Sequence, residues 1–195
     1  MGKKELKHFL KKESQNGVIK NCERLLEYYN EPKNATLDSI FLYMGSIGPT
    51  TFDPIHNDLV SSGTIDLLKN EELKQLLINW STDVIQLQEV EQMFLRYGEQ
   101  NLLPYVAEKG IGRDISYIFW KQAPVNLLES KKVRNLIPGK SKLSTFTKDE
   151  LLSDSKLESM IAHALDLNLF NNQESETLMK RIDHILQVLG DEIKK

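Results

Sequence analysis

The sequence predicts an all-α protein, an elongated and irregular bundle of about five to seven helices. Apolar residues recur at three- and four-residue spacing over most of the chain, which places them on one face of successive helices. Residues that typically begin and end helices flank these stretches. The longest apolar stripe lasts for about seven turns, and a helix of roughly 40 Å needs partners of similar length.

Composition and charge are those of an ordinary globular protein. The 195 residues are 40% apolar and 27% charged and contain no glycine-, serine- or proline-rich linker, so we expect a single domain over 1–195. A net charge of -3 argues against nucleic acid as a partner, because phosphate binding needs a concentrated positive face. Cys22 is the only cysteine, which excludes the cysteine-rich metal and redox motifs. No apolar run approaches the roughly 18 residues of a membrane span.

The first part of the chain predicts two helices. The first should run from Lys3 to about Tyr29, with Gly17 as a point where it frays or bends. The second should begin at Thr36, whose hydroxyl suits an N-cap, and end at about Gly45.

The stretch 51–80 predicts a helical corner. Asp53 and Pro54 suit the start of a short helix, and Gly63 suits its end, because a glycine adopts the left-handed conformation without a Cβ penalty. Asn70 then caps a long amphipathic helix that should run to about Tyr97. These four residues, Asp53, Pro54, Gly63 and Asn70, are predicted to have structural roles.

The register of the apolar stripe on this long helix decides whether Glu91 is buried. A strict 3.5-residue repeat through Leu73, Leu77, Trp80, Val84 and Leu87 carries Glu91 onto the buried seam, where a glutamate would need a partner. We expect instead that the apolar stripe drifts to Val90 and Phe94 and leaves Glu91 at the edge of the seam.

The region 98–146 is the least patterned and predicts short helices and loops that cross the bundle, with strands as an alternative. Regularity returns with two capping-box patterns, Thr147 with Glu150 and Ser155 with Glu158. Two apolar stripes follow, over 157–165 and 178–193. The polar pair at 171 and 172 lies between them, so one long helix and two shorter helices both remain open.

No motif in the sequence predicts a cofactor, a metal site or a catalytic site. Gly139-Lys140-Ser141 is similar to the end of a phosphate-binding loop, but Arg134 stands where that motif needs a glycine. Asp53 and His56 are near Asp58, but His56 and Asp58 would point about 200° apart on a helix and could not share an ion.

The best candidates for a ligand-binding site lie in the unpatterned region. Tyr105, Arg113, Tyr117 and Trp120 have the side chains best suited to hold a small polar or aromatic molecule. The alternative is that the three aromatic rings are core and that Arg113 lies in solvent.

The sequence resembles an uncharacterised family of bacterial proteins that is frequent among Bacteroidetes. The residues that carry the resemblance form a Leu-x-Ser-Ser-Gly motif, a hydrophobic connector and the start of a long helix: Leu59, Ser61, Ser62, Gly63, Ile65, Leu67, Leu68, Asn70 and Leu73. The last 45 residues are also similar, so that the resemblance covers about two thirds of the chain and is weak over 98–146. Family members have one N-terminal membrane helix followed by a helical extracytoplasmic domain without established activity. The resemblance implies a periplasmic location on the inner membrane, through an anchor that this sequence does not contain; a cytoplasmic location is the alternative.

Three function classes stay open. We expect a non-enzymatic extracytoplasmic domain that senses or binds a small ligand beside a membrane. A structural module that binds a protein partner is the alternative. An enzyme ranks third, since it would need several convergent polar groups in a concave site, which we would expect within 98–146.

Overall fold

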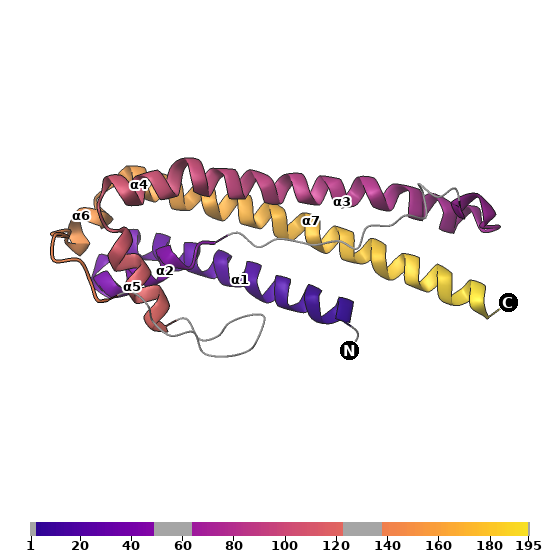
Figure 1. The fold of residues 1–195 in the computed structure, drawn as a ribbon, viewed down its shortest axis with the longest axis horizontal. Coiled ribbons are helices and arrows are strands. Elements are labelled where there is room, and N and C mark those ends of the chain that lie inside the picture. Colours follow the sequence, from indigo (N-terminus) through magenta and orange to yellow (C-terminus); the bar gives the residue numbers. More distant parts are fainter. Residues whose placement is uncertain (1–2, 49–63, 123–137, 195) are drawn as a thin grey trace. The chain divides into compact units, whose positions relative to one another are not determined.

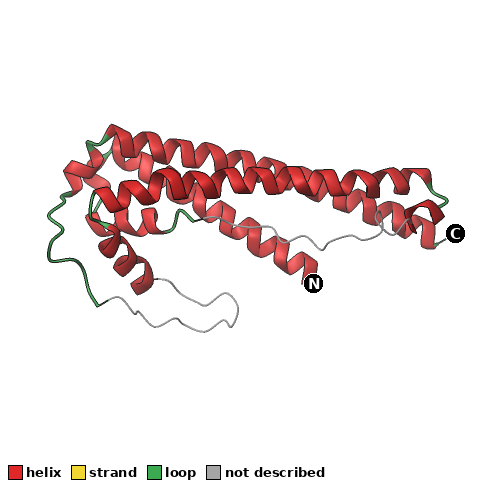
Figure 2. Cartoon of the chain, turned by 45° about the horizontal axis from the view of Figure 1, so that its top comes forward, coloured by secondary structure: helices red, strands yellow, loops and turns green. Residues whose placement is uncertain are grey.

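The protein is an all-α helical bundle. The computed structural model describes residues 3–48, 64–122 and 138–194, and within the first helix it describes side chains from Gly17 onward. The described residues form seven α-helices, two 3₁₀ turns and one π-helical turn, without a strand (Figures 1 and 2). Asp53, Pro54 and Gly63, to which the sequence assigns structural roles, lie outside the described residues.

The chain packs as two compact units, and the single domain expected over 1–195 stays a prediction. Unit 1 comprises 1–50 and 94–168, and unit 2 comprises 51–93 and 169–195.

Unit 1 contains most of the helices. They are α1 (Lys3–Asn30), α2 (Leu37–Gly45), α4 (Leu103–Glu108), α5 (Gly112–Gln122), α6 (Lys148–Leu152), the end of α3 (Glu71–Tyr97) and the first part of α7 (Ser155–Ile193). The 3₁₀ turn η1 (Pro32–Asn34) joins α1 to α2, and the π-helical turn η3 (Gly98–Leu102) joins α3 to α4. Helix α1 continues through Gly17 as one element, and a bend at that position stays a prediction.

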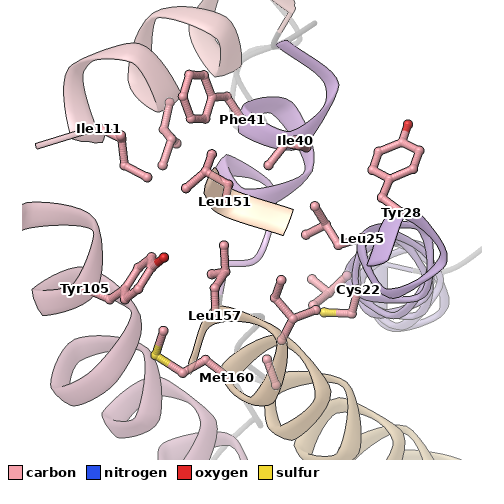
Figure 3. Packing of buried hydrophobic residues seen from close by; sticks show 14 of the residues in the cluster. Cys22, Leu25, Tyr28, Ile40, Phe41, Tyr105, Ile111, Leu151, Leu157 and Met160 are labelled. Carbon is pink, nitrogen blue, oxygen red and sulfur yellow. The ribbon is translucent and has the colours of Figure 1, made fainter. Parts of the chain in front are cut away.

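One apolar core joins these helices. Leu151 of α6 is fully buried among side chains that α1, α2, α4 and α7 contribute, including Leu25, Phe41, Tyr105 and Leu157 (Figure 3). Helices α2 and α5 cross closely at Gly45. A Cβ atom there would lie 3.0 Å from Ile115 Cγ2 and 3.1 Å from Phe119 Cβ, so the glycine permits this approach.

The short helices of unit 1 begin and end at residues with local physical reasons. Thr36 and Thr147 cap α2 and α6, and Thr147 forms the predicted capping box with Glu150. Helix α4 ends at Glu108, and Gly110, two residues later, has a φ of 67°. The Ile111 N–H donates to Val106 O at 3.2 Å, which is the long bond of a Schellman motif.

The start of α7 differs from the prediction. The cap is Asp154, whose Oδ1 accepts from the backbone N–H of Lys156 at 3.0 Å and of Leu157 at 3.4 Å. A capping box of Ser155 with Glu158 is therefore wrong by one residue, because a carboxylate next to the serine takes the capping position. From there α7 is continuous for 39 residues, so one helix spans both predicted stripes.

Unit 2 is built on an antiparallel pair formed by α3 and the second half of α7, preceded by the 3₁₀ turn η2 (Thr64–Leu67). Cross-helix contacts give the direction, since Asn70 Nδ2 donates to Glu192 Oε1 at 2.7 Å and Gln86 Nε2 donates to Glu174 Oε2 at 3.2 Å. The Asn70 carboxamide oxygen also accepts from the Leu73 N–H at 3.0 Å, which is N-cap geometry. Two apolar clusters lie in the interface, one around Leu73, Ile185 and Val188 and one around Val84, Leu87 and Leu178.

Candidate functional site

Of the four predicted ligand-binding residues, Tyr105 lies on α4 and the other three lie on α5. Tyr105 is 1% exposed in the core of unit 1, and its hydroxyl donates to Asp154 Oδ2 at 2.9 Å. Arg113, Tyr117 and Trp120 follow one another at four- and three-residue spacing and so share one face of α5. A ligand held by these three residues stays a prediction, whereas the Tyr105 ring is buried in the core and its hydroxyl is hydrogen-bonded to Asp154.

The three residues of α5 already have intramolecular contacts. The Arg113 guanidinium donates to the carbonyl oxygens of Pro138 at 2.9 Å and Gly139 at 3.1 Å, which ties the loop after position 137 to α5. Tyr117 packs against the core of unit 1, and the Trp120 ring, 39% exposed, meets the Phe119 ring edge-on at 5.3 Å. Of the two aromatic rings, Trp120 is the more exposed, because Tyr117 is partly buried.

Asp154 is a carboxyl group of unit 1 that four donors contact. Besides its two backbone contacts, its Oδ2 accepts from Tyr105 Oη and from Lys109 Nζ, each at 2.9 Å. The Lys109 ammonium chiefly, together with the Tyr105 hydroxyl and the α7 amides, lowers the pKa of this carboxyl from 3.8 to about 2. Burial and the same carboxylate raise the pKa of the Tyr105 hydroxyl. A carboxylate so fully bonded is a weak base, and its evident role is to anchor the start of α7 to α4.

A groove in unit 2 combines apolar and polar groups. It has a volume of about 460 Å³ between α3 and α7 and is lined by Leu76, Asn79, Thr82, Asp83, Arg181 and Ile185. Asp83 Oδ1 and Arg181 Nη1 form an ion pair across the two helices. The Asp83 side chain is 14% exposed and the Arg181 side chain 49% exposed, so the carboxylate lies deep and the guanidinium reaches the surface.

Polar pairs bound the groove along the same helix pair. His184 Nε2 lies 3.1 Å from Glu72 Oε1 on one side of the Asp83–Arg181 pair, and the Gln86–Glu174 hydrogen bond lies on the other. The second of these closes a smaller hollow of about 30 Å³, which Asp83 and Arg181 also line. The ion pair thus stands between two hollows.

Beyond the smaller hollow, the α3–α7 interface contains buried polar side chains. Glu91 is 5% exposed, Asn171 1% and Ser175 6%. The expectation that Glu91 lies at the edge of the seam is wrong: the interface keeps the strict heptad register, and Val90 and Phe94 are buried as well. Glu91 has an interaction partner. Asn171 Oδ1 and Ser175 Oγ are buried without a hydrogen bond.

The sequence analysis missed the residues of the groove, and although it considered Glu91 as a seam residue, it did not connect Glu91 with Asn171 and Ser175 as one polar layer. A signal for the polar layer was present, because Asn171, Ser175, Leu178, Ile182 and Ile185 alternate at spacings of four and three, the seam of a coiled coil. No comparable signal marks the groove, since its lining residues come from segments about a hundred positions apart and include no motif.

Among residues 3–48, 64–122 and 138–194, no three histidine, cysteine, aspartate or glutamate side chains gather as a metal would require. Nor does any helix in those ranges combine the length and the apolar character needed to cross a bilayer.

Comparison with known proteins identified no matching family model, no similar curated protein and no similar solved structure.

Proposed function

We propose that this protein is a non-enzymatic binding domain that senses or holds a small ligand, and that the ligand binds in the α3–α7 groove of unit 2. The observation that carries the proposal is the lining of this groove, in which an ion pair, an amide and a hydroxyl adjoin the apolar side chains of Leu76 and Ile185. Small-molecule sites typically have volumes of about 300–1,000 Å³ and combine an apolar surface with a few polar groups that orient the ligand.

The chemistry of the lining favours binding over catalysis. Its only carboxylate, Asp83, is paired with Arg181, and the remaining polar groups are the amide of Asn79 and the hydroxyl of Thr82. A nucleophilic mechanism needs a base within hydrogen-bond reach of the nucleophile, and the lining residues offer Thr82 no histidine or unpaired carboxylate.

The proposed setting is the periplasmic face of the inner membrane. The resemblance of the sequence to a family of anchored extracytoplasmic proteins supports this location; a cytoplasmic location is the alternative. Protease treatment of spheroplasts tests it, since a periplasmic domain is degraded while the membrane remains intact.

A thermal-shift screen against metabolites, glycans and metal ions tests the binding function. A ligand at a hundred times its dissociation constant adds about 2.7 kcal/mol, which raises the melting temperature by several degrees. Asn79→Trp fills the groove and should abolish the response. Gln92→Trp is the matched control, because Gln92 is an exposed amide on the same helix outside the lining of the groove. Equal responses in both variants would refute the groove as the site.

A second candidate function is that of a protein-interaction module. Unit 2 exposes large apolar side chains at seven-residue spacing, Ile78 with Ile85 on α3 and Leu186 with Ile193 on α7. Such repeats on a helix surface are typical of partner-binding faces. Light scattering that shows a stable homodimer, together with a screen that yields no ligand, would favour this function over the first.

A further inference from the structure

We propose that the α3–α7 groove recognises a small zwitterion with an apolar body, an α-amino acid with an aliphatic or aromatic side chain. This inference rests on the proposed binding function and specifies its ligand class. It follows from the charges of the Asp83–Arg181 pair, from the hydrogen-bonding groups beside the pair, and from the apolar side chains that complete the lining.

The ion pair leaves hydrogen-bonding capacity on both partners. Arg181 Nη1 pairs with Asp83 Oδ1. A guanidinium has five N–H donors and a carboxylate has about four acceptor positions, so each group can bind a second partner while the pair persists. Arg181 can therefore donate to a ligand carboxylate, and Asp83 can accept from a ligand ammonium.

The opposite charges of the pair favour a zwitterion over a simple anion or cation. A monoanion attracted by Arg181 is repelled by the adjacent Asp83, and a monocation meets the reverse arrangement. Glu72 and Glu174 flank the groove on either side, the first beside His184 and the second bonded to Gln86. These two further carboxylates disfavour polyanions such as nucleotides.

The rest of the lining suits the body of an amino acid. Ile185 is 9% exposed and Leu76 is partly buried, so that together they offer an apolar surface next to the ion pair. Asn79 Oδ1 accepts from Gln75 Nε2 at 3.0 Å, which leaves the Asn79 amide N–H groups as donors for a ligand carboxylate. An aliphatic or aromatic side chain on Leu76 and Ile185 would then lie beside a carboxylate on Arg181.

The test uses L-leucine and L-phenylalanine as probes, with N-acetyl-leucine and leucinamide as analogues that lack the ammonium or the carboxylate. Calorimetry and amide chemical shifts on the full chain should show binding of both amino acids. Each blocked analogue should bind at least about tenfold more weakly, because one charge-assisted contact is lost. Arg181→Gln should weaken leucine binding by a similar factor. Asp83→Asn should weaken leucine binding and strengthen binding of N-acetyl-leucine, because the repulsion of its carboxylate is removed. Circular dichroism checks that each variant is folded.

Glu89→Gln is the matched control and should leave leucine affinity unchanged, because Glu89 is an exposed carboxylate on α3 that lines neither hollow. Absence of binding by both amino acids at millimolar concentration overturns the ligand class. It leaves the proposed function standing if the broader screen yields another ligand that Asn79→Trp blocks. If the amino acids bind but Asn79→Trp and Arg181→Gln have no effect, the inferred site is wrong.

Discussion

Removal of the Asp154 carboxylate should cost unit 1 about 2 kcal/mol of stability at neutral pH and almost nothing in acid. The carboxyl has a pKa of about 2 in the folded protein against 3.8 ordinarily. Each pKa unit corresponds to about 1.36 kcal/mol of differential interaction, and the side chain is only 18% exposed, so screening by solvent removes little of the resulting 2 kcal/mol or so.

The direction of the pKa shift of Asp154 determines how the stability depends on pH. Because the folded state binds the proton less tightly than the unfolded state, the stabilisation is complete above the ordinary pKa of about 4 and is lost as the pH falls toward 2. Asp154→Asn keeps an oxygen that can cap α7 but has no charge for Lys109. The difference in unfolding free energy between wild type and variant should therefore shrink from about 2 kcal/mol near pH 6 to near zero at about pH 2.

Urea titrations followed by the fluorescence of Trp120 measure this difference. A Trp80→Phe background removes the other tryptophan, so the signal reports on unit 1. Asp149→Asn is the matched control: its side chain is 85% exposed and lies 3.9 Å from Lys148 Nζ, and its removal should cost less than about 0.5 kcal/mol at every pH. A wild-type-to-Asp154→Asn difference that stays constant between pH 6 and 2 would refute the electrostatic account of this contact.

Three further predictions concern the core and the polar layer. Gly45→Ala should destabilise unit 1 by about 1 kcal/mol in urea titrations, because the new methyl group would meet α5 at 3.0–3.1 Å; Gly48→Ala, which meets nothing within 4 Å, should cost nothing measurable, and equal effects would contradict the close crossing. Asn171→Leu should raise the urea midpoint by the equivalent of about 1–2 kcal/mol, because a buried oxygen without a hydrogen bond is removed; a lower midpoint would mean that this oxygen has a partner. Cys22 is fully buried, and burial raises the pKa of its thiol to about 12, so thiol reagents should react with it only upon unfolding; rapid labelling of the native chain would show that α1 opens locally.

Helix positions were predictable from sequence wherever a local signal had no competitor. Thr36, Asn70 and Thr147 precede α2, α3 and α6 as expected, because an N-cap acts through bonds to amides only two or three residues away. The start of α7 was misplaced because Asp154 and Ser155 are both good caps. In the structure Asp154 is the cap, and it also contacts Tyr105 and Lys109, which lie about fifty residues earlier. No local sequence pattern contains these contacts.

The candidate groove could not be predicted, because it depends on which faces of two distant segments meet. Asp83 and Arg181 each occur in an amphipathic helix in which most charged residues face solvent, and nothing in either helix specifies the other as its partner. Their pairing follows from the antiparallel alignment of α3 with α7, which brings residues near 83 level with residues near 181. To predict this alignment, one would first have to know that α7, and not another helix, packs on α3.

Glu91 shows where an energetic argument from sequence alone goes astray. The heptad register predicts that Glu91 is buried, whereas the free-energy cost of burying a carboxylate predicts that it lies at the edge of the seam. That cost applies in full only to a carboxylate without a partner. In the structure Glu91 does have an interaction, and Asn171 and Ser175 lie at seam positions of the facing helix, so burial of the carboxylate occurs within a polar layer and not in a purely apolar one. Polar residues at single seam positions of coiled coils commonly specify register at some cost in stability. A polar layer on both helices of unit 2 would act in the same way. A shift of α3 along α7 by one heptad would place the Glu91 carboxylate against apolar seam residues such as Leu178, at a cost in free energy. This cost favours the observed alignment, on which the Asp83–Arg181 pair and the groove depend.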